Sequence, residues 1–264
     1  MSEPGPLSAV KFKSVRLLLN KKYRLKEGRC LIEGRRFVSE ALRAGATVEM
    51  VMVTVDFAAQ NEGKDLIGVA RLAGAEIRTI NPSQLPVLSD TVTAQGVVAV
   101  VRLPGAALED LPVRGPGPSL VIALDGVSDP GNVGTIIRTG AWFGADGILL
   151  GAGCAELSSP KVLRSTMGAV FHVPVVAGAD LPDAVRRLKR DGFRIIAAAA
   201  GGVDTFAGAT KSLMIFGSEA HGVSAELVSM ADARYWIPKY GAGESLNVSV
   251  AAGVALSRFR AGQG

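Results

Sequence analysis

The sequence predicts an α/β protein of two domains, and three observations lead to that prediction. With 264 residues, the chain is long enough for two domains that each bury a core. Apolar runs of strand length alternate with amphipathic helical patterns, and the 32 glycines suit the tight turns between them. Residues 103–118 are rich in Pro and Gly without any periodicity, which is typical of a linker. We therefore expect a disordered N-terminus at 1–10, a first domain at 11–102 and a second domain at 119–264.

The first domain is predicted to be a small α/β module. Two runs of apolar and β-branched residues, 48–55 and 96–103, have the length and composition of strands. Amphipathic patterns at 37–45 and 64–74 have the spacing of helices.

The second domain is predicted to contain a parallel sheet with helices on both faces, because nearly continuous apolar strands alternate with amphipathic helices. In such sheets, ligands bind beyond the carboxyl ends of the strands, so the loops that follow the strands are the candidate sites. The expected strands lie at 119–125, 146–151, 171–176, 194–200, 211–217 and 234–239. The expected helices lie at 135–145, 159–170, 181–193, 225–231 and 245–259.

The composition argues against several classes of protein. Cys30 and Cys154 are far apart in the sequence, and only His172 and His221 are histidines, so a metal centre or a histidine-dependent triad has little support. We interpret both cysteines as ordinary buried thiols. No apolar run approaches the roughly 18 to 20 residues of a membrane span, and the N-terminus lacks the apolar stretch of a signal peptide. The expected location is the cytoplasm.

The net charge of +5 is concentrated in the first domain. Residues 1–102 contain 15 Lys and Arg against 10 Asp and Glu, whereas residues 103–264 contain 14 of each. Such a cluster favours a polyanion as partner, although a solvated helix face would have the same composition. Charge alone leaves both interpretations open. The candidate contacts to such a polyanion are Lys21, Lys22, Arg24, Arg29 and Arg35.

Three loops of the second domain combine glycines with polar residues directly before a helix, at 125–138, 217–222 and 237–247. Glycine lets a backbone approach a ligand closely, and a helix start favours anionic groups. Each polar residue also has a structural explanation, as a helix cap, a carboxylate at a helix start or a surface charge. Arg138 fits that explanation least, because its neighbours are mostly small or apolar and a charge in a packed stretch needs a partner or a function. The candidate site residues are Asn132, Arg138, Glu219, Ser245 and Asn247.

Two common nucleotide-binding motifs are not met. The sequence GAGCAE at 151–156 begins like a dinucleotide-binding fingerprint but has Glu156 where the third glycine should stand. No phosphate-binding loop of the type G-x-x-x-x-G-K-[ST] occurs in the sequence. A dehydrogenase and a P-loop NTPase are therefore both disfavoured.

At the three loops the sequence resembles the SpoU, or TrmH-like, branch of the SPOUT RNA methyltransferases. The three motifs of that family match, in order, DPGNVGTIIRTGAWFGA, LMIFGSEAHGVS and IPKYGAGESLNVSVAAGVAL. The segment after the first motif matches SPKVLRSTMGAVFHVPV. Near the N-terminus, LLNKKYRLKEGRCLIEGRRFVSEALRAG resembles the family's substrate-binding module, a small fold similar to an RNA-binding ribosomal protein.

The resemblance implies a C-terminal domain with a deep trefoil knot, an S-adenosylmethionine site formed by the knot loops, and a homodimer. Carried over by position, the cofactor contacts fall on Gly217, Ile237 and Leu246, largely through backbone groups. The family's catalytic residues correspond by position to the five candidate site residues named above. One position departs from the family pattern: Lys239 stands where an apolar residue is usual, which puts cofactor or RNA contacts there in doubt.

The activity implied by the resemblance is methyl transfer to a ribose 2′-hydroxyl of RNA, without a metal. Arg138 is then either a desolvated base, or a charged group that orients the hydroxyl while another group accepts the proton. Arginine does not readily lose its proton in proteins, so both versions stay open. A 23S-type ribosomal RNA is the favoured substrate. The alternatives are a transfer RNA methyltransferase, a base methyltransferase and a non-catalytic RNA-binding protein with the same fold.

Overall fold

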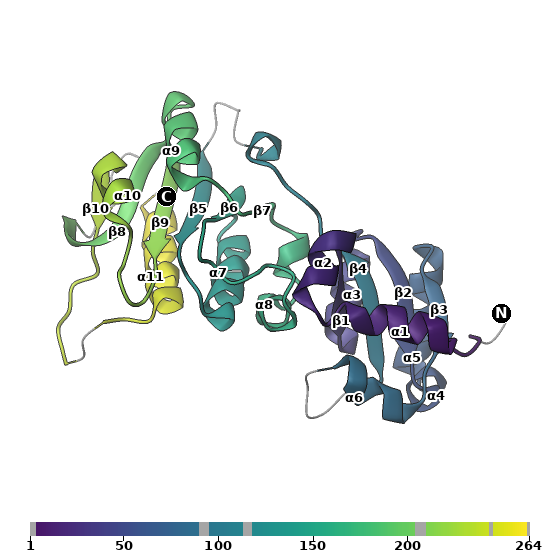
Figure 1. Cartoon of the computed structure of the whole chain (residues 1–264). Coiled ribbons are helices and arrows are strands. Elements are labelled where there is room, and N and C mark those ends of the chain that lie inside the picture. The colour runs from purple at the N-terminus through teal and green to yellow at the C-terminus, as the bar shows by residue number, and fades with distance from the viewer. Residues whose placement is uncertain (1–3, 90–94, 113–117, 204–209, 243–244, 263–264) are drawn as a thin grey trace. The chain divides into compact units, whose positions relative to one another are not determined.

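The computed structural model describes residues 4–89, 95–112, 118–203, 210–242 and 245–262 (Figure 1). The chain divides into two compact units. The N-terminal unit contains the residues up to 104 together with residues 158–171, and the C-terminal unit contains residues 105–157 and those from 172 onward.

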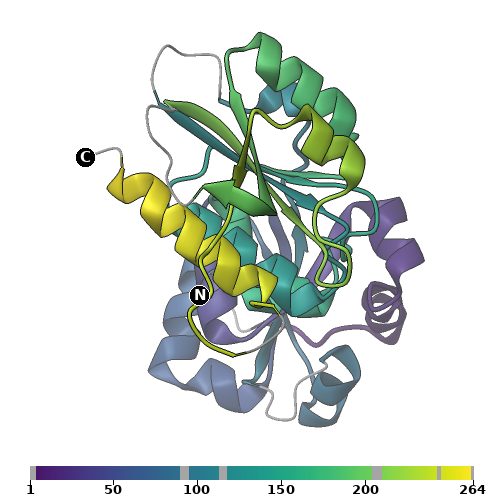
Figure 2. The same ribbon diagram turned by 90° about the vertical axis from the view of Figure 1, so that its left-hand side faces the viewer.

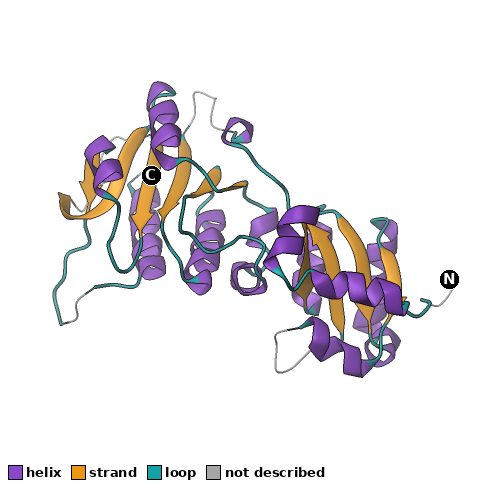
Figure 3. Cartoon of the chain, viewed as in Figure 1, coloured by secondary structure: helices purple, strands orange, loops and turns teal. Residues whose placement is uncertain are grey.

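The N-terminal unit is built on a four-stranded mixed sheet (Figure 3). The strand order is β1-β4-β2-β3, in which β4 is antiparallel to both of its neighbours and β2 is parallel to β3. The strands are β1 (Arg29–Glu33), β2 (Val48–Val53), β3 (Glu76–Thr79) and β4 (Val97–Arg102). The two strands expected from the sequence, now β2 and β4, are confirmed, whereas β1 and β3 were not expected.

Helices cover both faces of this sheet. Leu18, Met52 and Val98 belong to the core between one face and the helices α1 and α6, and α3 and α5 contact the other face. The α-helices that precede β4 are α1 (Ala9–Leu17), α2 (Lys21–Glu27), α3 (Arg35–Arg43), α4 (Val55–Ala59), α5 (Asn61–Leu72) and α6 (Leu85–Leu88). The expected helices 37–45 and 64–74 correspond to α3 and α5.

The N-terminal segment is ordered from residue 4 onward, contrary to the expectation of disorder at 1–10. The backbone N–H of Leu7 donates to the carbonyl of Thr79 at 2.9 Å, and the N–H of Thr79 donates to the carbonyl of Gly5 at 3.0 Å. The side chain of Leu7 is buried in the core. This pairing extends the edge of the sheet at β3 and buries an apolar side chain, which offsets the entropy lost on ordering the segment.

The C-terminal unit is built on a six-stranded sheet in which all neighbouring strands are parallel, as the sequence predicts. The strand order is β10-β8-β9-β5-β6-β7. The strands are β5 (Ser119–Asp125), β6 (Gly147–Leu150), β7 (Val175–Ala177), β8 (Arg194–Val203), β9 (Lys211–Gly217) and β10 (Ala233–Tyr235).

The helices of this unit lie on both faces of the sheet, α7 and α11 on one face and α9 and α10 on the other (Figure 2). Alternate residues of the strands, such as Val121 and Ile215, pack against α9 and α10. A Cβ on Gly140 of α7 would lie 2.8 Å from Ile122 Cδ1, so the absent side chain lets α7 approach the sheet closely. The helices are α7 (Pro130–Trp142), α9 (Leu181–Arg190), α10 (Ala225–Met230) and α11 (Val248–Ala261).

None of the helices in the described part of the chain is long and apolar enough to cross a bilayer. The longest of them, α11, has 14 residues, whereas a span needs about 20. Both cysteines are free thiols, Cys30 buried and Cys154 half-buried.

Two segments differ from the domain boundaries expected from the sequence. The described part of the 103–118 segment carries a 3₁₀ turn at Leu108–Asp110, and Leu111 is buried in the core of the C-terminal unit. The helix α8 (Pro160–Thr166) and the 3₁₀ turn Ala169–Phe171 were expected in the second domain but belong to the N-terminal unit, where α8 contacts β1. The apolar residues of α8, among them Val162 and Leu163, are buried there.

Arg24 joins α2 to the 158–171 segment. Its guanidinium is almost completely buried and donates to the carbonyls of Leu18 at 3.2 Å and Leu19 at 2.8 Å, while its Nε donates to Ser158 Oγ at 3.2 Å. The prediction that Arg24 contacts RNA is therefore wrong. Its charge lies inside the unit because the carbonyls at the end of α1 need donors.

We expect Arg24→Ala to destabilise the protein by at least about 2 kcal/mol, since buried carbonyls would lose their donors. Thermal or urea unfolding of the full chain would measure this. Arg16→Ala, at an exposed position of α1, is the matched control and should change stability by less than about 0.5 kcal/mol. Equal stability of the two variants would contradict the structural role of Arg24.

Candidate functional site

The loops after β5, β9 and β10 leave the sheet at one edge, because all six strands are parallel. Asp125 at the end of β5 pairs in register with Gly217 at the end of β9, so the first two loops start side by side. Such an edge is where parallel sheets bind ligands.

The first loop ends in a capped helix start. The side chain of Asp129 accepts a hydrogen bond from the backbone N–H of Asn132 at 2.9 Å, and Pro130 occupies the first helical position of α7. Asp129 is thus the cap of α7, so a role as helix cap does not explain Asn132. Asn132 lies in the first turn of α7 with its amide free to bond elsewhere.

The second loop folds back tightly on the end of β9. A Cβ on Gly217 would lie 1.9 Å from the carbonyl carbon of Gly222, so only glycine fits at that position. The N–H of Gly222 donates to the carbonyl of Ser218 at 2.8 Å, and the N–H of Ser224 donates to Asp125 Oδ2 at 2.8 Å. Asp125 therefore ties the second loop to the start of the first.

Glu219 lies inside this turn and not at a helix start, because α10 begins only at Ala225. Its carboxylate accepts a hydrogen bond from Asn132 Nδ2. The alternative of a carboxylate placed for a helix dipole is therefore wrong. Glu219 instead links the second loop to α7.

The third loop ends at Asn247, which caps α11. Its Oδ1 accepts from the backbone N–H of Ser249 at 2.9 Å, and its Nδ2 donates to Asn132 Oδ1 at 3.1 Å. This donation leaves the Nδ2 of Asn132 as the donor to Glu219. The cap fixes the orientation of the Asn247 amide, because its oxygen must face the N–H of Ser249. The nitrogen of Asn247 then faces the oxygen of Asn132, which fixes the orientation of the Asn132 amide.

One hydrogen-bonded chain, Asn247 to Asn132 to Glu219, therefore links the three loops. The structure brings together these three of the five candidate residues. Because Asn132 gives one hydrogen bond and receives the other, it holds α7, α11 and the second loop in a fixed relation. Carboxylate and amide groups in this arrangement can orient a hydroxyl or a cation at the sheet edge.

Arg138 is exposed, contrary to the expectation that it lies in a packed stretch. Its neighbours Ile136 and Ile137 are fully buried, but α7 is amphipathic and its outer face carries Thr135, Arg138 and Trp142. The apolar residues next to Arg138 in the sequence were misleading, because in a helix they lie on the buried face and Arg138 lies on the outer face. Among the residues that the structure describes, no hydrogen bond or ion pair involves the Arg138 side chain.

The remaining predicted residues lie along the third segment. Ile237 follows the end of β10 and is half-buried, whereas Ser245 and Leu246 are exposed directly before Asn247. The Ser245 hydroxyl makes no hydrogen bond within the described ranges. Gly217 at the end of β9, and Ile237 and Leu246 in the third loop, thus all lie at or beyond the carboxyl ends of strands. Their predicted contacts are with a cofactor.

Cys154 lies beside the first loop and has a structural role. Its thiol donates to the carbonyl of Leu124 at 3.1 Å. Burial raises the pKa of the Cys154 thiol above its ordinary value, against the smaller opposing effect of the backbone N–H groups around it. Such a thiol is a poor nucleophile near neutral pH.

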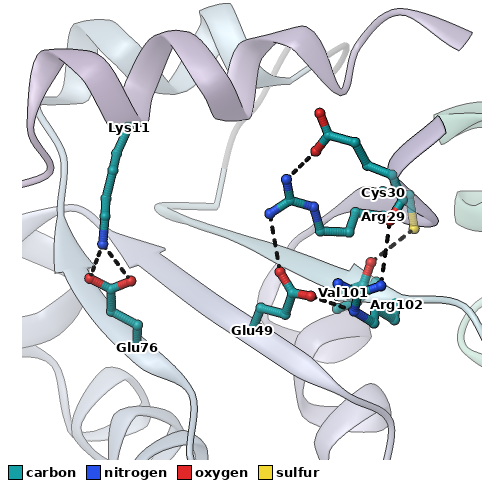
Figure 4. A network of polar contacts seen from close by, with 8 residues as sticks. Lys11, Arg29, Cys30, Glu49, Glu76, Val101 and Arg102 are labelled. Atoms are coloured by element: carbon teal, nitrogen blue, oxygen red, sulfur yellow. Dashed lines mark hydrogen bonds and ion pairs between the residues drawn. The ribbon is translucent and has the colours of Figure 1, made fainter. Parts of the chain in front are cut away.

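The basic residues predicted to contact RNA fall into distinct groups. Figure 4 shows Glu49 between Arg29 and Arg102, with which it forms ion pairs. Arg29 also pairs with Glu27. The hydrogen bond to Glu27 raises the pKa of Arg29, so its charge is engaged within the protein. Arg35 pairs with Glu62 at 3.4 Å. Lys21 and Lys22 are exposed, and neither has a partner in the described part of the chain.

Sequence reasoning missed Asp125 and Asp129, which organise the site. A signal for Asp129 was available, because Asp directly before Pro is a common way to start a helix. For Asp125, the only feature of the sequence that could have predicted a role in the site is its position at the end of an apolar strand.

The chain belongs to the SpoU rRNA methylase family, whose model matches residues 119–257. Residues 10–99 match the MRM3-like substrate-binding domain. The family match covers all three loops, and the substrate-binding match covers most of the N-terminal unit.

Known proteins resemble the chain over nearly its full length. The 23S rRNA (guanosine(2553)-2′-O)-methyltransferase RlmP of Bacillus subtilis is 32% identical over 253 residues, covering 95% of this chain and 96% of RlmP. The AdoMet-bound rRNA methyltransferase from Sinorhizobium meliloti superposes with a TM-score of 0.86 at 27% identity, covering 98% of this chain and 97% of that one. The SpoU methyltransferase AviRb from Streptomyces viridochromogenes, in complex with AdoMet, also has a TM-score of 0.86 at 27% identity, covering 97% and 98%.

Proposed function

We propose that this protein is an RNA methyltransferase that uses S-adenosylmethionine to methylate a ribose 2′-hydroxyl, with a 23S-type ribosomal RNA as its substrate. The single observation that carries the proposal is the chain from Asn247 through Asn132 to Glu219, which joins the three family motifs at the sheet edge. RlmP, which is similar over 95% of this chain, acts on such a hydroxyl in 23S rRNA, and that similarity supports the choice of substrate.

The residues at the sheet edge fit S-adenosylmethionine. Gly217 lies at the carboxyl end of β9, where its backbone groups can contact a ligand, and Ile237 and Leu246 supply apolar surface for an adenine ring. We assign Gly217, Ile237 and Leu246 to the cofactor. Lys239 is exposed just past Ile237, where its charge would lie near the cofactor or the RNA. The bound cofactor would supply an activated methyl group on a sulfonium, so the protein has only to bind and align the hydroxyl.

Arg138 acts in this proposal as an orienting cation. A role as base would require severe desolvation of the guanidinium, which the exposed outer face of α7 does not provide within one chain. Arg138 would therefore hold the RNA phosphate or the 2′-oxygen, and water or a neighbouring carboxylate would accept the proton. We assign the orientation of Arg138 and the ribose to Asn132, Glu219, Ser245 and Asn247.

We further propose that the C-terminal domain at 119–264 is knotted and dimeric. The match of residues 119–257 to the SpoU methylase family supports the knot, which the resemblance of the three motifs implies. Large apolar side chains exposed on α7 and α11, Trp142 and Val250, support a second chain as partner. The first domain at 11–102 would bind RNA, and the cytoplasm is the compartment that we assign to the protein.

We expect the full chain to bind S-adenosylmethionine or its demethylated product in the presence of a chelator, because no metal is needed to hold a cofactor by backbone and apolar contacts. Isothermal calorimetry would measure the affinity. Gly217→Ala should lose binding together with the turn from Gly217 to Gly222, since its Cβ would collide with the Gly222 backbone. Failure of the wild type to bind either molecule would contradict the site assignment.

We expect Lys21→Ala and Lys22→Ala each to weaken RNA binding and to lower the slope of log affinity against log salt by about one, because each lysine neutralises a phosphate. Affinity for S-adenosylmethionine should not change. Lys64→Ala, at an exposed position of α5, is the matched control. An unchanged slope in both lysine variants would mean that Lys21 and Lys22 form only a solvated face.

A further inference from the structure

A groove of about 670 Å³ opens in the N-terminal unit. It is formed by the start of α3, the junction of α4 with α5, the segment before β4, and α8 with the residue that follows it. All of these elements belong to one compact unit. The volume lies within the range of about 300–1,000 Å³ that encloses small ligands in proteins.

The groove presents guanidinium groups that are available to a ligand. Arg36 and Arg164 are exposed, and neither has an ion pair or hydrogen bond through its side chain among the residues that the structure describes. The carboxylates of the groove are engaged, since Glu62 pairs with Arg35 at 3.4 Å and Glu33 accepts from the hydroxyl of Ser89. Two unpaired guanidiniums at one groove are suited to phosphate, which they bind through paired N–H donors.

The groove also has apolar surface next to those charges. Phe37 and Phe57 line its interior and are almost buried. Met167 lines it too, with 49% of its surface exposed and a φ of 50°. Its left-handed backbone is that of the C-cap of α8, and the side chain at this cap is exposed at the groove. The flexible thioether of methionine suits a flat, variable partner such as a nucleobase.

Two side-chain amides complete the groove. The Oε1 of Gln95 accepts from the backbone N–H of Arg35 at 3.1 Å, which leaves the amide nitrogen of Gln95 as a donor. Gln60 is the N-cap residue of α5, but its side chain makes no cap hydrogen bond and lines the groove. Amides of this kind pair with the edges of bases that are not engaged in a helix.

We propose that this groove binds one unpaired nucleotide of the RNA substrate. Arg36 and Arg164 hold its phosphate, Met167 contacts the face of the base, and Gln95 and Gln60 contact its edge. The inference rests on the proposed function, since it names how the same RNA is recognised. It excludes a regular duplex as the occupant, because paired bases present neither a free face nor a free Watson–Crick edge.

The groove combines residues from both sequence modules. Arg164 and Met167 lie between β6 and β7 of the C-terminal unit in the sequence, within the region that matches the methylase family. Arg36 lies within the match to the substrate-binding domain. An RNA held in the groove would therefore contact residues of both matched regions, Arg36 of the substrate-binding domain and Arg164 and Met167 of the methylase family match.

The test uses the full chain, a transcript of 23S ribosomal RNA that contains 4-thiouridine, and the variants Arg36→Ala/Arg164→Ala and Met167→Ala. The double variant should bind the transcript at least about tenfold more weakly and lower the salt slope by about two, because two charged contacts are lost. Met167→Ala should weaken binding with an unchanged slope. Ultraviolet cross-links should map to residues 33–37 or 160–167, and Arg43→Ala, an exposed position at the end of α3, is the control for net charge.

The outcomes separate this inference from the proposed function. A double variant with wild-type affinity and salt slope, or cross-links that all lie outside both segments, overturns the groove assignment while methyl transfer by the wild type stands. A wild type that binds S-adenosylmethionine but neither binds nor methylates the transcript overturns both. Unfolding curves of each variant, equal to that of the wild type, show that a lost affinity reflects the groove and not the fold.

Discussion

Arg138→Ala is expected to lower methyl transfer by at least about a hundredfold while the fold and the affinity for S-adenosylmethionine stay intact. The expected size is that of removing one preorganised group that acts on the reacting oxygen. Because Arg138 is exposed and has no partner in the described ranges, its removal leaves no buried charge unpaired and should cost little stability. Turnover and thermal unfolding should be measured on the same preparation.

Two further variants sharpen this prediction. Arg138→Lys should recover little activity, because a point charge does not reproduce the planar fork that orients two acceptors. Arg186→Ala, at an exposed position of α9 in the same unit, should leave turnover unchanged. Near-normal turnover in Arg138→Ala would sink the assignment and move the reacting role to Glu219 or Ser245.

Asn132→Ala is expected to lower turnover by about a hundredfold, because it removes the residue that joins the three loops. The two lost hydrogen bonds are partly exposed, so the free energy of unfolding should fall by no more than about 2 kcal/mol. Turnover and urea unfolding of the same variant would distinguish loss of the site from loss of the fold.

The pH dependence of Asn132→Asp tests the same hydrogen bond. In that variant two carboxylates face each other, and the repulsion disfavours the state in which both are charged. A shared proton at low pH restores the missing donor, so the loss of turnover relative to wild type should shrink as the pH falls.

Variants of Glu219 test the other end of this hydrogen bond. Glu219→Gln keeps an oxygen acceptor for Asn132 and should retain more activity than Glu219→Ala. Equal losses at every pH and in both Glu219 variants would argue against this role of the hydrogen bond.

The sequence predicted the fold well where burial on both faces determines the pattern. The strands β5, β8 and β9 are long apolar runs, and their parallel pairing follows from the helices between them. The short strand β3 was missed because its residues are half-buried and polar, which is also the pattern of a loop. The packing of α8 in the N-terminal unit depends on contacts with β1 and Arg24, which local sequence does not encode.

For the candidate site, the sequence predicted a set of residues but not how their side chains meet. The loops were located by their glycines and polar residues, yet the hydrogen bonds of Asn132 join positions about ninety and more than a hundred residues away in the chain. For Arg24, the sequence predicted a role in binding that the folded structure contradicts. Arg24 belongs to a basic stretch, but the carbonyls that bind its guanidinium become available only when α1 and α2 are folded.

Locating the transferred methyl group tests the central claim most directly. The full chain would be incubated with methyl-labelled S-adenosylmethionine and a 23S ribosomal RNA transcript, and the RNA would then be digested to nucleosides and separated. We predict that the label appears in one 2′-O-methylnucleoside, and that Arg138→Ala gives none above background. Label on a base, or no transfer by a folded protein that binds the cofactor and the RNA, would contradict the account.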